Sequence, residues 1–155
     1  LLAKLRGEPY CTEIPLIQVE PLVPAPPLAD PRTATIALVT SGGVVPSGNP
    51  DRIEARRASR WSKFPIARID DLTPQHFECV HGGFDNALVA EDPDRVLPVD
   101  AMRELEREGK IGRLFDYCYT TVGAGAPIER ARRFGREIGE ELLAAGVQAV
   151  ILTAT

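Results

Sequence analysis

The sequence predicts an α/β protein, built on an open, mostly parallel sheet with flanking helices. Apolar runs typical of strands lie at 35–40, 114–122 and 147–153, and an amphipathic helix pattern fills 127–145 between the last two. A strand, a helix and a second strand in this order form a crossover unit, whose two strands run parallel. The predicted architecture is three-layered and Rossmann-like.

Composition excludes several classes of protein. With 155 residues and 44% hydrophobic content, the chain is long enough for one domain with a buried core. A net charge of −4 argues against a nucleic-acid or membrane-surface partner. No apolar run approaches the roughly 20 residues that cross a bilayer, and no secretory signal is visible. We therefore expect a cytoplasmic protein.

Cysteine and histidine usage argues against a disulfide framework and against a metal site. Cys11, Cys79 and Cys118 are odd in number and far apart, which is typical of reduced thiols. His76 and His81 lack the spacing of paired metal ligands. We expect no cofactor held by this chain.

Residues 1–33 are predicted to form a proline-rich arm ahead of an α/β domain at 34–155. Repeated prolines exclude a long helix or a central strand there. Ile14, Leu16, Ile17 and Val19 favour an arm that docks on the domain or on a partner subunit. The alternative is a loose linker.

The strand at 35–40 runs into Ser41, Gly42 and Gly43. Glycines in such a loop let backbone N–H groups approach an anion, and the alternative is a turn that needs positive φ. Farther along, Arg52, Arg56, Arg57 and Arg60 accompany a short basic helix predicted at 53–63, which we interpret as a solvated face.

A second candidate loop follows at 80–85. It contains His81, Gly82, Gly83 and Asp85. The histidine is suited to donating to a substrate carboxylate or to acid–base chemistry, and Asp85 would orient it or cap the next turn. The alternative is a tight turn whose histidine packs against the surface.

The stretch at 98–108 predicts an amphipathic helix that Gly109 ends. We interpret this helix as scaffold. Its acidic residues then form a solvated face rather than catalytic carboxylates: Asp100, Glu104, Glu106 and Glu108.

The strand at 114–122 ends in Gly123 and Gly125, and Pro127 opens the next helix. Gly146 suits the left-handed position past that helix, and the apolar run that follows predicts a strand covered on both faces. The alternative is a frayed tail.

Parallel strands place their carboxyl ends at one edge of the sheet. The glycine loops and whatever follows Thr155 should therefore meet at that edge, where open α/β sheets bind ligands. The helix N-terminus at Pro127 would favour a carboxylate. A dinucleotide site is disfavoured, because the last glycine of the G-x-G-x-x-G pattern is replaced by Ile128.

Five stretches in order resemble the selenoprotein subunit of component B of the glycine/sarcosine/betaine reductases. They cover most of residues 34–155 and read ATIALVTSGGVVPSGNPDRIE, VHGGFD, DPDRVLPVDAMRELEREGKIG, TVGAGAPIERARRFGREI and AGVQAVILTAT. The selenoprotein subunit of D-proline reductase is similar at VHGGFD and at the last strand.

This resemblance implies a selenocysteine directly after Thr155, whose codon would have been read as a stop. The chain would then be the N-terminal part of the subunit. In the family, a selenolate attacks the α-carbon of a glycine-type amine and displaces the amine. The implied partners are a subunit that carries a pyruvoyl group and a selenoprotein that accepts the carboxymethyl group.

No nucleophile of the family maps onto the chain, so we expect the 155 residues to be inactive alone. Candidate residues for the pocket wall remain Ser41, Gly42, Gly43, His81, Gly82, Gly83, Asp85, Gly123 and Gly125. The alternative function is a non-catalytic module that binds a small carboxylate or another subunit. A sheet with an unpaired edge would also self-associate.

Overall fold

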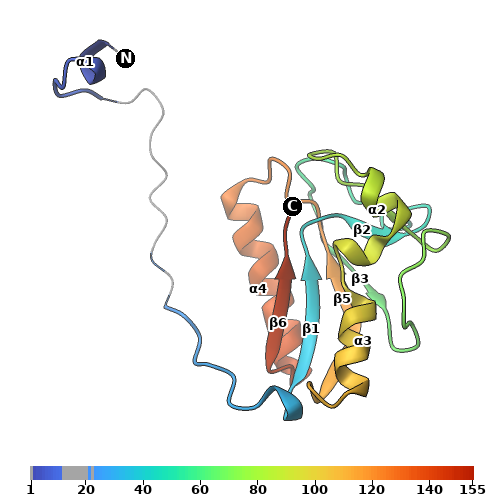
Figure 1. Ribbon diagram of the computed structural model, residues 1–155. Coiled ribbons are helices and arrows are strands. Elements are labelled where there is room, and N and C mark those ends of the chain that lie inside the picture. Colours follow the sequence, from blue (N-terminus) through green and yellow to red (C-terminus); the bar gives the residue numbers. More distant parts are fainter. Residues whose placement is uncertain (1, 12–20, 22) are drawn as a thin grey trace.

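The computed structural model describes residues 2–11, 21 and 23–155 (Figure 1). From residue 99 onward, helices and strands alternate along the chain. In chain order, the elements are α1 (Leu2–Leu5), η1 (Pro31–Thr33), β1 (Thr35–Thr40), β2 (Val44–Pro46), β3 (Ser62–Pro65), β4 (Phe77–Cys79), α2 (Ala87–Glu91), η2 (Pro93–Arg95), α3 (Val99–Arg107), β5 (Arg113–Thr120), α4 (Ile128–Ala144) and β6 (Ala149–Thr153).

The main sheet confirms the predicted fold class. Its strand order is β3-β5-β1-β6, and β1 pairs in parallel with both β5 and β6. β3 is antiparallel to β5 at the far edge. Helix α4 lies on one side of the sheet, and α3 lies on the other (Figure 1). The connection from β5 through α4 to β6 crosses over β1, which lies between these two strands.

Alternation along β1 builds one hydrophobic core on each face of the sheet. Ile36 and Leu38 belong to the core that includes Met102 of α3. Ala37 and Val39 belong to the core that includes Ile138 of α4. Because successive side chains of a strand point to opposite faces, one strand holds both layers in place.

The terminal strand was predicted correctly as a strand, but the expectation that it is covered on both faces is wrong. Val150 and Leu152 are 47% and 66% exposed, and Ile151 is 37% exposed. β6 lies at the edge of the sheet, while the buried residues of α4 pack with side chains of β1 and β5. The apolar run therefore marks a surface of the described structure rather than its interior.

The predicted basic helix at 53–63 is also wrong. Arg52 and Arg57 have positive φ angles of 53° and 52°, which no helix accommodates. The end of the stretch is instead β3, where Ser62 and Phe64 are buried in alternation with exposed neighbours. Pairing with β5 makes the end of this segment a strand. Helix propensity is a weak guide where tertiary pairing is available.

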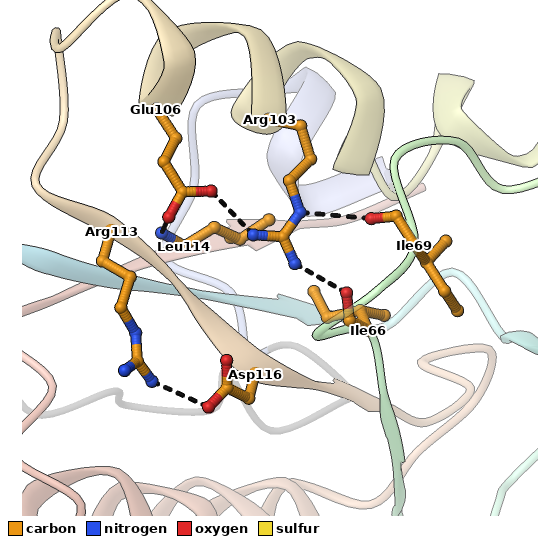
Figure 2. Close-up of polar contacts among 7 residues, drawn as sticks. All are labelled: Ile66, Ile69, Arg103, Glu106, Arg113, Leu114 and Asp116. Atoms are coloured by element: carbon orange, nitrogen blue, oxygen red, sulfur yellow. Dashed lines mark hydrogen bonds and ion pairs between the residues drawn. The ribbon is translucent and has the colours of Figure 1, made fainter.

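One acidic residue of α3 is part of the scaffold and not of a solvated face. Figure 2 shows the half-buried Glu106 accepting from Arg103 Nη1 at 2.7 Å and from the backbone N–H of Leu114 at 3.1 Å. Arg103 also donates to the carbonyls of Ile69 and Ile66, at 3.1 and 2.6 Å (Figure 2). This buried guanidinium ties the segment after β3 to α3 and β5, and breaking such a network by removing one partner is costly.

The described part of the arm approaches the domain. Residues 25–29 line a cavity of about 590 Å³ together with the end of α4 and the beginning of β6. The proposed docking residues Ile14, Leu16, Ile17 and Val19 lie outside the described residues. The division at 33/34 remains a prediction. Among the described residues, no helix is both long and apolar enough to cross a membrane.

The open edge of β6 makes a testable prediction about assembly. No lysine, proline or bulge protects this edge, so we expect the chain to self-associate through it. Leu152→Lys should shift the protein toward the monomer in light scattering. Leu88→Lys, at another exposed leucine on α2, is the matched control. A monodisperse monomer of the unmodified chain would contradict the expectation.

Candidate functional site

The carboxyl edge of the parallel strands gathers four segments that are far apart in the sequence. Residues 41–43 follow β1, 121–125 follow β5, and the chain end follows β6 at the same edge (Figure 1). The loop at 81–83 joins them from the end of β4. A Cβ atom on Gly42 would lie 3.3 Å from Thr155 Cγ2, and one on Gly83 would lie 3.1 Å from Ala124 Cβ.

Backbone hydrogen bonds fasten the loop after β1 to both neighbouring strands. Ser41 N–H donates to Thr153 O, and Gly43 N–H donates to Thr121 O, each at 3.0 Å. The N–H of Gly123 donates back to Ser41 O at 2.9 Å. The edge is therefore one hydrogen-bonded unit, and its position follows from the pairing of β1.

The N–H groups of five candidate glycines bond to protein acceptors: Gly42, Gly43, Gly82, Gly83 and Gly123. Gly42 N–H donates to Thr40 Oγ1 at 2.9 Å, and Gly82 N–H donates to Ala55 O at 2.7 Å. Together with the bonds of Ser41, Gly43 and Gly123, these leave no N–H of residues 41–43 directed at a ligand. The hypothesis that these glycines cradle an anion through their backbone has no support in this arrangement.

The glycines instead allow the loops to approach one another closely. Gly43 has a φ of +70°, and a Cβ there would lie 2.8 Å from Val122 Cγ2. A Cβ on Gly83 would lie 2.6 Å from His81 Cε1. Real Cβ atoms do not make such contacts, so both the turn and the packing require glycine. On the outer side, Gly125 has a φ of +65° and adjoins Arg57.

His81 is the buried titratable group of this edge, with 4% of its surface exposed, so it does not pack against the surface. Its Nδ1 accepts the N–H of Gly83 at 3.1 Å, and its Nε2 lies 3.3 Å from Thr155 Oγ1. Burial, and then the nearby Arg56 guanidinium, lower the pKa of His81 from 6.5. The ring packs on Phe84 with centroids 4.9 Å apart. The geometry favours a neutral imidazole that carries its proton on Nε2.

Asp85 caps the following turn and does not orient His81. Its Oδ1 accepts the N–H of Ala87, the first residue of α2, at 3.0 Å. Asn86 also holds the histidine loop, since its Nδ2 donates to His81 O at 2.9 Å and to Cys79 O at 3.3 Å. Sequence reasoning missed this amide, because its contacts depend on how the loop folds back.

A row of hydroxyl groups crosses the sheet just inside this edge. Thr40 lies opposite Thr120 on one side and Thr153 on the other, and Ser62 lies opposite Thr120. Thr153 Oγ1 donates to Thr40 Oγ1 at 2.8 Å. Thr120 is 1% exposed and its hydroxyl has no partner among the described residues. The interior next to the site is therefore more polar than the strand pattern indicated.

An apolar cavity of about 340 Å³ opens beside the same edge. Ser41 and Gly123 line one end of it, and Phe134, Ile138 and Leu152 line its apolar wall. Its size suits a small ligand or a few side chains of a partner. Within the described residues, no cluster of three or more His, Cys, Asp or Glu is placed to hold a metal ion.

Comparison with known proteins identifies the family. The family described as glycine/sarcosine/betaine reductase selenoprotein B matches residues 1–155. The chain belongs to this family. It is 53% identical to the glycine reductase complex component B subunit gamma of Carboxydothermus hydrogenoformans over all 155 residues. It spans 36% of that relative's length, so it corresponds to about a third of the subunit.

Further relatives cover the other reductases of this selenoprotein B family. In Peptoclostridium acidaminophilum, identity is 48% to the glycine reductase subunit gamma, 43% to the sarcosine reductase subunit beta and 42% to the betaine reductase subunit beta. The D-proline reductase subunit gamma of Acetoanaerobium sticklandii is 33% identical over 141 residues. No solved structure matches the chain.

Two glycines allow a test of the close packing at this edge. Gly43 and Gly48 both have positive φ, but a Cβ on Gly48 would meet nothing within 4 Å. Gly48→Ala should cost about 1 kcal/mol, the conformational penalty alone. Gly43→Ala adds a clash with Val122 and should cost about 2–4 kcal/mol. Urea unfolding measures both, and equal losses would contradict the close-packing role.

Proposed function

We propose that this chain is part of a glycine reductase component B subunit and forms the sheet edge that presents the subunit's reactive residue. The observation that carries the proposal is the family match over all 155 residues, combined with the meeting of three loops at the end of β6. The reaction class is reductive deamination: the bond between the α-carbon and the amine nitrogen breaks, and a dithiol supplies the electrons.

Glycine is the proposed substrate among the candidate amines. Relatives from a single organism rank in the order glycine, sarcosine and betaine reductase, at 48%, 43% and 42% identity. Comparison within one organism removes differences between species as the cause of that ranking. The substrate carboxylate would lie near the end of β6, where Arg56 and the N-terminus of α4 add positive potential.

The proposed reactive residue is the selenocysteine that the family resemblance places after Thr155. The selenol of this residue suits the chemistry for the same reason as a thiol of low pKa. It is ionised at neutral pH, and its anion is nucleophilic. A strand end fixed by hydrogen bonds holds such a residue in place better than a loose loop would.

The proposed partners are a subunit bearing a pyruvoyl group and a selenoprotein that accepts the carboxymethyl group. The names of the relatives speak of reductase complexes with several components, which supports assembly with other subunits. No cofactor is proposed for this chain, since the pyruvoyl group would belong to the partner. We propose a cytoplasmic location, in keeping with three free cysteines.

The 155-residue chain alone should release no amine from glycine, sarcosine or betaine in the presence of a dithiol. The reason is that none of its residues supplies the proposed nucleophile. Ammonia and methylamine assays check this for glycine and sarcosine, and a trimethylamine assay checks it for betaine. Measurable turnover of any of the three would refute the assignment of the nucleophile to a position after Thr155.

A chimera tests the proposed function directly. These 155 residues replace the matching segment of the Carboxydothermus hydrogenoformans subunit gamma, and the product is assembled with that organism's other components. We expect ammonia release from glycine within about tenfold of the parent, a difference of about 1.4 kcal/mol in activation free energy. A folded, assembled and inactive chimera would favour the non-catalytic alternative, and a preference for sarcosine or betaine would overturn the substrate assignment.

A further inference from the structure

His81 makes two different hydrogen bonds with its two ring nitrogens. Nδ1 faces inward and accepts the N–H of Gly83 at 3.1 Å, within its own loop. Nε2 faces the end of β6 and lies 3.3 Å from Thr155 Oγ1, 74 residues away in the sequence. The first bond fixes the tautomer, and the second connects the loop after β4 to the last residue of the chain.

Packing around the ring leaves it little freedom. Its edge meets the backbone of Gly83, where a Cβ would lie 2.6 Å from Cε1. Its face packs on Phe84, and Asn86 holds the carbonyl of His81 from the other side. A ring held this firmly presents its Nε2–H in one direction, toward the end of the strand.

We infer that His81 is a positioning residue that fixes the exit of the chain from β6 by donating its Nε2–H as a neutral imidazole. This rests on the proposed function, because the exit from β6 matters for chemistry if the reactive residue follows Thr155. A neutral donor orients the strand end and can donate to a nearby anion without adding a positive charge.

The groups that face the ring are compatible with a neutral donor. Among the described residues, Arg56 in the loop after β2 is the charged side chain that acts on His81, and its charge opposes protonation of the ring. The thiol of Cys79, on β4, bonds to Gly42 O at 3.3 Å, and burial raises its pKa, which keeps the thiol protonated. Thr155 supplies the acceptor from the side of β6.

Nuclear magnetic resonance of the ¹⁵N-labelled 155-residue chain tests the tautomer and the charge. We expect Nδ1 of His81 to show the shift of an acceptor nitrogen and Nε2 that of a protonated one, with a titration midpoint below 6.5. A proton on Nδ1, or a midpoint at or above 6.5, would overturn the inference. This measurement does not depend on enzymatic activity.

Two variants in the active chimera separate positioning from a purely structural role. An asparagine oxygen can replace Nδ1 as the acceptor for Gly83 N–H, whereas a glutamine amide can replace Nε2–H as the donor to Thr155. His81→Asn should therefore lower kcat about 100-fold with little change in KM, since a small displacement of a reacting group has that effect. His81→Gln keeps a donor to Thr155, so its kcat should stay within about tenfold of that of the unmodified chimera.

The outcomes distinguish the inference from the proposed function. If His81→Asn keeps full kcat while His81→Gln does not, the histidine acts through Gly83 alone and the positioning role is wrong. Equal and full activity of both variants would also overturn it. If the unmodified chimera is inactive, the proposed function fails, and the spectroscopic result still decides whether His81 is the neutral Nε2–H donor. Thermal unfolding of each variant checks that it is folded.

Discussion

Parallel pairing of β1 with a strand on each side is the interaction on which the rest of the structure depends. Its register places Thr40 opposite Thr120 in β5 and Thr153 in β6, so the three strands end at the same level. Side chains of β1 also contribute to the cores on both faces of the sheet. The loops that follow these three strands therefore begin at the same edge of the sheet, because parallel strands share a carboxyl edge.

The glycine residues of the loops contribute to the site mainly through their small size. The N–H groups at 41–43 bond to neighbouring strands or to Thr40, so they tie the edge together rather than face a ligand. Because Gly43 and Gly83 have no side chains, their loops can pack closely around His81 and bury it. The ionisable group buried at this edge is therefore a side chain, His81, whose pKa is lowered by burial.

Family membership and geometry contribute different parts of the interpretation. The match over residues 1–155 shows the family, while the chain represents 36% of the length of a relative. The geometry shows which groups converge at the end of β6 and which do not, as with Asp85, which caps α2. β6, the outer strand of the sheet, also contributes Leu152 to the apolar cavity beside the site. The exposed apolar surface of this strand therefore adjoins the candidate site.

Local sequence patterns determined the elements whose signals are self-contained. The strands at 35–40 and 147–153 and the helix at 127–145 follow from periodicity and from glycines such as Gly146, which has a φ of +73°. Tertiary structure decided what depends on distant partners. β3 formed in place of a helix because β5 offered an edge to pair with, and Glu106 became half-buried because it bonds to Arg103 and to the N–H of Leu114. The burial of His81 and its bond to Thr155 likewise depend on residues 74 positions apart, a distance over which local pattern carries no information.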